Sequence, residues 1–288
     1  LRQAGYHISA LYRNERSDRS PAVSWIKVGD LAATPIDPGI GHGIDIFVHL
    51  AATLRPTSDD PSGLQSQTAA IARNISRFVA DAGVPRVLML SSIAASLAAR
   101  DPAHARRYGM EKLAAEKIIL KKSRDNRHVV ILRPPAVYGQ GMQNSLSTLA
   151  GMVRRGLPIP LGSATQPRHY ISIHNLCSLI EKIIDSDGYR WAAAAGHAFE
   201  PSDGQAIATR DLIKMMGDAM GRRARLLPVP RGLVHALGTV MGRSELVSGA
   251  LDRLDVAPIR ELEAAFDWRP VEQMPESLAF LRDDVSSA

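Results

Sequence analysis

The sequence predicts an α/β fold in which a doubly wound parallel sheet is followed by a smaller, mostly helical lobe. Three observations lead to this prediction. Short apolar runs rich in β-branched residues alternate with helical patterns through the first 140 residues, which is typical of crossover units between parallel strands. The rhythm then changes to a succession of helical segments. The composition, 45% hydrophobic and 22% charged over 288 residues, is that of a globular chain with a sizeable core.

The elements of the first half follow in order. Buried strands are expected at 6–12, 23–28, 44–50, 87–90 and 129–132. Helices are expected at 63–82, where Gly83 and Pro85 end the pattern, and at 104–122. The segment 34–43 is broken by prolines and glycines, which predict a loop or a weak helix.

Helical segments dominate the second half, at 145–155, 175–185, 210–221 and 231–241. Breaks containing proline or glycine separate them. We therefore expect one domain over residues 1–140 and a second lobe over residues 141–288, some of whose segments return to the sheet.

Charge and cysteine content narrow the classes of function. Lys and Arg outnumber Asp and Glu by 35 to 29, which gives a net charge of +6 and a pI near 9.7. The arginines are scattered and aromatic residues make up 5%, so we expect no nucleic-acid partner; a small anionic ligand explains the surplus equally well. Cys177 is the single cysteine, which fits a reducing, cytoplasmic compartment. We expect neither a signal peptide nor a membrane span, since no apolar run approaches ~18 residues.

Residues at the carboxyl ends of strands are the candidates for a site, because ligands of doubly wound sheets bind there. Ser92 follows the strand at 87–90. Tyr108 and Lys112 are four residues apart, so they lie on one face of a helix. A nearby ammonium favours the phenolate, so we expect Lys112 to lower the pKa of Tyr108 toward neutrality, as a general acid/base requires. The four-residue spacing of Tyr108 and Lys112 is by itself weak evidence for a catalytic pair. The evidence is stronger because the pair lies between a strand that ends in Ser-Ser and a strand that leads into Arg-Pro-Pro.

Three other residues have simpler interpretations. His169 and His174 are five residues apart and lack carboxylate partners, so no metal site is expected. Tyr138 is expected to pack within its turn rather than to transfer protons.

Seven short motifs occur in an order that resembles a known family. They are Gly29-Asp30-Leu31, His49-Leu50-Ala51-Ala52, Gly83-Val84-Pro85-Arg86 leading to Ser91-Ser92, Tyr108-x-x-x-Lys112 with Glu116, Leu132-Arg133-Pro134-Pro135 with Val137-Tyr138-Gly139, Arg168-His169-Tyr170-Ile171-Ser172-Ile173, and Trp268-Arg269-Pro270. The chain resembles the extended short-chain dehydrogenase/reductases, specifically the NAD-dependent epimerase/dehydratase group that acts on nucleotide sugars. Within that group, the Leu161-Gly162 turn before Arg168 and the later Leu226-Leu227-Pro228-Val229-Pro230 look most like bacterial sugar 4-epimerases and 4-keto-reductases of surface-polysaccharide pathways.

The resemblance implies a Rossmann-like fold, NAD or NADP as cofactor, and hydride transfer on a nucleoside-diphosphate sugar. It implies that Ser92, Tyr108 and Lys112 are catalytic, that Ser92 also orients the sugar oxygen, and that Arg168 contacts the substrate diphosphate. The implied cofactor contacts are Arg13, Asp30, Leu31, Leu50, Ala51, Ala52, Tyr108, Lys112, Pro134, Pro135, Ala136 and Val137. A homodimer is expected from the resemblance alone.

The chain departs from the family pattern at its start. The family opens with a strand, normally central to the sheet, and a glycine-rich turn that binds pyrophosphate. This chain begins at Leu1 without either, so we expect a fragment that lacks the first strand, roughly twenty residues in all. Thr68 also replaces the usual asparagine, and His174-Asn175 stands where an acidic residue often follows.

Several alternatives stay open. Arg13 and Arg16 favour the 2′-phosphate of NADP, whereas Glu15 favours NAD. A dehydratase is disfavoured because the stretch 93–96 lacks the Asp-Glu pair that such enzymes place there. A non-catalytic binding or assembly protein of the same fold, or an inactive fragment of the enzyme, is the alternative to an active enzyme.

Overall fold

The structure is a computed structural model that describes residues 5–14, 20–53, 59–121, 128–240, 251 and 253–283. The chain forms two compact units. Unit 1 comprises Leu1–Arg133 and Ile183–Phe199, and unit 2 comprises Pro134–Lys182 and Glu200–Ala288. Each unit therefore draws on two separate stretches of the sequence.

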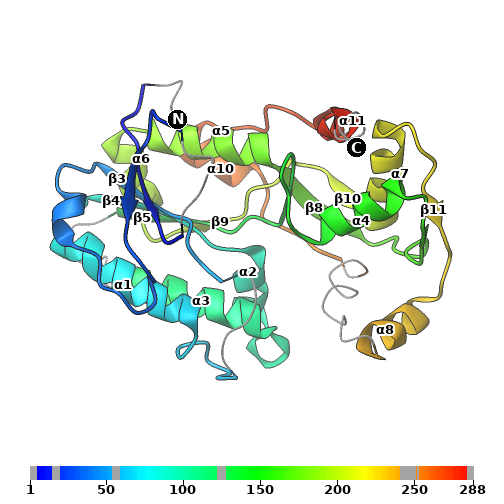
Figure 1. Cartoon of the computed structure of the whole chain (residues 1–288), viewed down its shortest axis with the longest axis horizontal. Helices are drawn as coiled ribbons and strands as arrows, with labels where there is room; N and C mark the ends of the chain where they lie inside the picture. Colours follow the sequence, from blue (N-terminus) through cyan, green and yellow to red (C-terminus); the bar gives the residue numbers. More distant parts are fainter. Residues whose placement is uncertain are drawn as a thin grey trace. The chain divides into compact units, whose positions relative to one another are not determined.

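Unit 1 is built on parallel strands (Figure 1). Its larger sheet has the order β3-β4-β5-β9, made by Ile46–His49, Arg86–Leu90, His128–Leu132 and Ala198–Phe199. All neighbours in this sheet pair in parallel, which confirms the predicted α/β class. The interior of β4 and nearly all of β5 are buried, which explains why their sequences are continuously apolar instead of alternating.

A separate two-stranded sheet comes earlier in the chain. β1 (Ser9–Tyr12) and β2 (Ser24–Lys27) pair in parallel. Tyr12 packs edge-on against Trp25, with 6.3 Å between ring centres. Among the described residues no strand pairing joins β1 to β3. The single sheet expected from the sequence is thus divided into two sheets.

Four helices accompany these strands: α1 (Gln67–Asp81), α2 (Ile93–Arg100), α3 (Arg107–Lys121) and α6 (Gly188–Ala194). α1 begins where the Ser66 side chain accepts a hydrogen bond from the amide of Ala69. It ends before Gly83, whose positive φ of 70° suits glycine. α1 and α3 pack together, and α1 buries Ile71, Ile75 and Phe78 in the core of the unit.

All four of these helices differ from the expected elements. The sequence predicts neither α2, an alanine-rich helix capped by Ser92, nor α6, and α1 begins at Gln67 instead of at residue 63. The helix expected at 104–122 begins later, because Pro102–His104 forms a separate 3-10 turn.

Unit 2 adds strands to the helices that the sequence predicts. β6 (Ala136–Tyr138), β8 (Pro167–Ser172) and β10 (Ala206–Ala208) form a sheet of order β10-β8-β6. A second pair joins β7 (Pro158–Ile159) to β11 (Arg225–Leu226). Apart from β8 these strands have two or three residues, too few to leave a periodic pattern.

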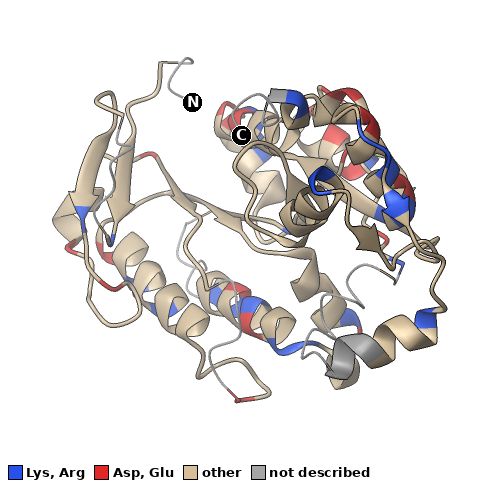
Figure 2. Cartoon of the chain, turned by 45° about the vertical axis from the view of Figure 1, so that its right-hand side comes forward, with Lys and Arg blue, Asp and Glu red and all other residues tan. Residues whose placement is uncertain are grey.

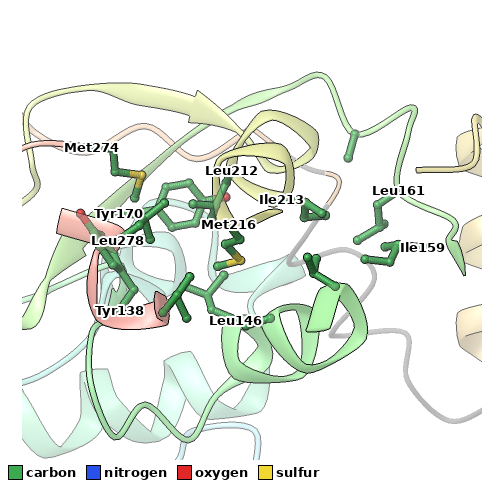
Figure 3. Packing of buried hydrophobic residues seen from close by; sticks show 14 of the residues in the cluster. Tyr138, Leu146, Ile159, Leu161, Tyr170, Leu212, Ile213, Met216, Met274 and Leu278 are labelled. Atoms are coloured by element: carbon green, nitrogen blue, oxygen red, sulfur yellow. The ribbon is translucent and has the colours of Figure 1, made fainter. Parts of the chain in front are cut away.

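The helices of unit 2 are α4 (Ser145–Arg154), α5 (Ile173–Ile184), α7 (Thr209–Ala219), α8 (Arg231–Val240), α10 (Arg260–Phe266) and α11 (Phe280–Asp283). The first four match predicted segments to within two residues. Figure 3 shows how Leu146 of α4, Met216 of α7 and Tyr170 of β8 gather in one apolar cluster. Unit 2 therefore has a core of its own.

Charged residues are spread over several elements of both units (Figure 2). In unit 2, Arg222, Arg223 and Arg225 line an open hollow of about 610 Å³ together with Val153 and Leu226. Among the described residues no helix is both long and apolar enough to span a bilayer.

Candidate active site

The carboxyl ends of three parallel strands meet at one edge of the larger sheet of unit 1. β3, β4 and β5 end in neighbouring register. The amide of Ser91 donates a hydrogen bond to the carbonyl of Leu132 at 2.7 Å, which extends the pairing beyond β4. Leu50, Ser92 and Arg133 come next in the chain, so they lie at the edge where parallel sheets bind ligands.

Ser92 and Tyr108 come together at this edge. Ser92 is the N-cap of α2, and its Oγ accepts a hydrogen bond from the amide of Ala94 at 3.2 Å. Tyr108 lies in the first turn of α3, and its hydroxyl is hydrogen-bonded to the Ser92 side chain. A hydroxyl pair from a strand end and a helix is the arrangement that could hold and protonate one substrate oxygen.

Two glycines fix the turn of α3 that carries Tyr108. A Cβ at Gly109 would overlap the carbonyl oxygen of Ala94, so α3 and α2 meet here backbone to backbone. A Cβ at Gly63, which has φ of +71°, would lie 2.7 Å from the backbone of Glu111. The first turn of α3 is therefore held from two sides.

Lys112 lies one turn further along α3 and is only 5% exposed. Its ammonium is 6.0 Å from the centre of the Tyr108 ring. Burial lowers the pKa of Lys112 to about 8, although the Glu116 carboxylate acts in the opposite direction. The ammonium form therefore predominates below about pH 8 and is lost above it.

The pKa of Tyr108 corrects one expectation. Burial raises it above its ordinary value, and this effect exceeds the lowering that the Ser92 hydrogen bond produces. The expectation of a Tyr108 pKa near neutrality is thus wrong for this structure, because desolvation of the phenolate outweighs the favourable contacts.

Two buried ionisable residues interact with Lys112, namely Glu116 of α3 and His49 at the end of β3, which is 3% exposed. Glu116 forms an ion pair with Arg133, whose side chain is 17% exposed, and the sequence predicted no role for any of the three. The sequence could have indicated Glu116, since it lies four residues after Lys112 and therefore on the same face of α3. His49 and Arg133 are strand-end residues whose burial only the tertiary structure shows.

Two predicted cofactor residues meet beside the ends of β1 and β2. The Arg13 guanidinium lies 3.9 Å from the Asp30 carboxylate, and both side chains are largely exposed. Asp30 Oδ1 accepts a hydrogen bond from the amide of Ala32 at 3.0 Å, which shapes the turn containing Leu31. Asn74 of α1 supports this turn by donating to the Leu31 carbonyl at 3.0 Å. Glu15 and Arg16 lie outside the described residues.

The segment after β3 has the small residues that a flat ligand needs. Leu50 is 63% exposed, and Ala51 and Ala52 are half-buried. Thr53 Oγ1 and Thr68 Oγ1 are hydrogen-bonded at 2.6 Å. Thr68, which replaces the usual asparagine of the family, thereby ties this segment to α1.

The remaining predicted residues lie in unit 2. Pro134 and Pro135 precede β6, which contains Ala136 and Val137. Arg168 lies in β8 next to β6 and makes a side-chain hydrogen bond with the buried Tyr170 hydroxyl.

Tyr138 and the two histidines have structural contacts. The Tyr138 hydroxyl is fully buried and donates to Asp203 Oδ2 at 2.7 Å. His169 Nδ1 lies 3.1 Å from the carbonyl of Leu254, and His174 Nδ1 lies 3.3 Å from the carboxylate of Glu272. The described residues hold no group of three side chains suited to a metal ion.

Comparison with known proteins identifies a family and a shared fold. The sequence profile of the NAD dependent epimerase/dehydratase family matches residues 1–190. A UDP-glucose 4-epimerase from Vibrio cholerae is 31% identical over 215 residues, which are 70% of this chain and 64% of that protein. The chain thus spans less than two thirds of the length of this relative.

Solved structures share the fold at low sequence identity. MoeE5, in complex with UDP-glucuronic acid and NAD, superimposes with a TM-score of 0.75 at 20% identity, covering 100% of this chain and 94% of its own. The UDP-N-acetylglucosamine 4-epimerase from Bacillus cereus superimposes with a TM-score of 0.72 at 13% identity, and the match covers 100% of this chain and 90% of that protein.

Proposed function

This chain belongs to the NAD-dependent epimerase/dehydratase family, and on that premise we propose that it acts on a nucleoside-diphosphate sugar as an NAD(P)-dependent 4-epimerase or 4-keto-reductase. The observation that carries the proposal is the cluster of Ser92, Tyr108 and Lys112 at the carboxyl edge of the sheet. A phenol, a hydroxyl and a buried ammonium are the groups that proton transfer at a carbinol needs.

Each side chain has a task in this reaction. A bound nicotinamide would supply hydride transfer at the carbinol carbon in either direction. Tyr108 takes the proton of the sugar hydroxyl as the carbonyl forms, and gives it back when the carbonyl is reduced. Ser92 holds the same oxygen. The Lys112 ammonium stabilises the phenolate that forms on Tyr108, whose pKa is otherwise raised by burial.

The residues of unit 1 fit a dinucleotide. We expect Lys112 and Tyr108 to hold ribose hydroxyls, and the small side chains of Ala51 and Ala52 support the binding of a flat ligand. Arg13, ion-paired with Asp30 and largely exposed, would be available to the adenosine end. An arginine at that place favours the 2′-phosphate of NADP over NAD.

For unit 2 we propose that residues 134–137 contact the nicotinamide end and that Arg168 binds the substrate diphosphate. A guanidinium suits this task because it donates in a fixed fork. The names of the relatives, a UDP-glucose 4-epimerase and a UDP-sugar complex, support a UDP-sugar as the first substrate to test.

The substitution Tyr108→Phe tests the proposal. It removes the proton donor and keeps the ring, so we expect turnover of the preferred sugar to fall about 10²–10⁴-fold. Nicotinamide reduction and epimer formation are measured with UDP-, dTDP- and GDP-sugars. Tyr189→Phe is the matched control, because this tyrosine is 84% exposed on α6. Cofactor binding without turnover in any sugar would favour the binding-protein alternative, and full turnover of the Tyr108→Phe variant would refute the mechanism.

A further inference from the structure

A buried carboxylate lies one helical turn beyond Lys112. Glu116 is 1% exposed, and its carboxylate is hydrogen-bonded to two neighbouring side chains. Arg133 Nε donates to its Oε1 at 3.0 Å, and Arg133 Nη2 donates to its Oε2 at 2.5 Å. The Ser91 hydroxyl donates to Oε1 as well. The Glu116 carboxylate therefore accepts hydrogen bonds from two guanidinium nitrogens and one hydroxyl.

The same pair connects the elements that carry the proposed catalytic residues. Ser91 is the neighbour of Ser92 at the end of β4, and Arg133 follows β5. Arg133 Nη1 also donates to Ser96 Oγ of α2 at 3.1 Å. The pair therefore links the β4 end, α2 and α3.

The charges around Lys112 explain what the carboxylate does. Burial penalises the ammonium, and Glu116 is the anion that opposes this penalty. Among the described residues, Tyr108 and Glu111 of its own helix and His49 of β3 are further ionisable neighbours of Lys112, whereas Arg133 acts through its ion pair with Glu116. His49 is neutral because burial lowers its pKa to about 3. The ionisable side chains of the helices packed on α3 are exposed: Arg73, Arg77 and Asp81 of α1, and Arg100 of α2.

We propose that Glu116, held in place by Arg133, keeps Lys112 charged beside Tyr108, so that Glu116 and Arg133 are positioning residues for the reaction. This inference rests on the proposed function for its catalytic meaning. Its electrostatic content stands apart, because the charge state of Lys112 can be measured without any substrate.

Opposite shifts in two variants test the proposal. Glu116→Gln keeps the shape and removes the anion, so we expect the midpoint of Lys112 titration to fall by about one unit or more. Arg133→Gln removes the cation that balances Glu116, so we expect the midpoint to rise. The chain has only seven lysines, so NMR of ¹³C-labelled lysine side chains can follow each titration, with Lys112→Met assigning the signal.

The controls distinguish an electrostatic effect on Lys112 from a loosening of the fold. Loosening of the fold would expose Lys112 and raise its midpoint in both variants, so parallel upward shifts, or none, would overturn the proposal. Arg133→Lys keeps the positive charge and should restore the midpoint to within about half a unit if Arg133→Gln does not fold. Glu263→Gln breaks an exposed Arg–Glu pair of unit 2 and should change nothing.

Turnover is measured separately. If Lys112 acts as an ammonium, the alkaline limb of kcat moves to lower pH in Glu116→Gln. Opposite NMR shifts with no effect on the kcat profile would leave the electrostatic pair intact and refute its catalytic role. An inactive wild-type chain with opposite NMR shifts would instead count against the proposed function alone.

Discussion

At the scale of single residues, His49 is a buried imidazole whose proton affinity is lowered by its surroundings. It is 3% exposed at the end of β3, and no described residue offers a hydrogen bond to its Nδ1. Burial, and then the charge of Lys112, lower its pKa from 6.5 to about 3. The imidazole is neutral in the folded chain, and a protonated His49 would add a second buried cation next to Lys112.

This arrangement predicts a loss of stability in acid. Between pH 6.5 and about 3, His49 binds a proton in the unfolded chain but not in the folded chain. The contribution of His49 to the free energy of unfolding therefore decreases as the pH falls through that window. The slope from one such group is at most about 1.4 kcal/mol per pH unit. Urea unfolding of wild type and His49→Gln at pH 7 and pH 4 measures it, and the variant should depend less on pH.

His104→Gln is the control for this measurement, since that side chain is 86% exposed. An equal pH dependence in wild type and His49→Gln would show that His49 is hydrated or paired in solution. The difference in unfolding free energy between wild type and His49→Gln at pH 7 gives the effect of the substitution on packing, and the further change at pH 4 gives the effect of protonation.

The sequence could identify Ser92, Tyr108 and Lys112 because their spacing and strand-end positions are local properties. It could not give the direction of the Tyr108 pKa, which depends on how much of the phenolate is desolvated by the helices around it. The Glu116–Arg133 pair joins residues 17 apart in the sequence through an ion pair that forms only when α3 packs on β5.

At the scale of elements, the site depends on how closely α3 approaches α2. The alanine-rich α2 buries Ala95 and Ala98, and Gly109 of α3 faces the Ala94 carbonyl. Small residues on both helices bring Tyr108 within reach of Ser92. The sequence did not predict α2, because eight residues with only alanine, isoleucine and leucine on their apolar side carry little periodic signal.

Gly109→Ala tests this contact. Its methyl group would overlap the Ala94 carbonyl, so the helices must separate, at a cost of about 1–3 kcal/mol in unfolding free energy. We also expect turnover to fall, since the Ser92–Tyr108 hydrogen bond would lengthen. Thermal unfolding and the sugar assay measure the two effects.

The matched control is Gly151→Ala in α4, where a Cβ meets only Arg155 Nη2 at 3.5 Å. Helix propensity there favours alanine, so the control should be unchanged or stabilised by up to about 1 kcal/mol. A Gly109→Ala variant as stable and active as wild type would mean that α2 and α3 are not in this close contact.

At the scale of the whole molecule, the predicted alternation of strands and helices holds for unit 1, since buried parallel strands are long apolar runs that the sequence displays. Unit 2 was predicted less completely, because β7 and β11 have two residues each and are recognised only through their pairing. The division of the sheet between β1 and β3 is likewise a property of pairing rather than of either strand. Among the described residues each unit has a large apolar core, and a smaller cluster of Ala95, Ala98 and Leu113 joins α2 and α3.

The divided sheet predicts an uneven distribution of stability. β4 and β5 are buried and have strands on both sides, whereas β1 and β2 pair only with each other among the described residues, and none of their residues is fully buried. A two-stranded sheet is marginal without packing support, and Leu11 gives β1 only a partly buried contact with the core. We therefore expect the amides of β1 and β2 to exchange with solvent deuterium at least about tenfold faster than those of β4 and β5, a difference of ~1.4 kcal/mol or more in opening free energy. Hydrogen exchange followed by mass spectrometry on the intact chain measures both sets in one experiment, with β8 as the internal reference for unit 2. Equal protection in β1 and β4 would mean that the two sheets open as one cooperative sheet in solution, and the division between β1 and β3 would then have to be given up.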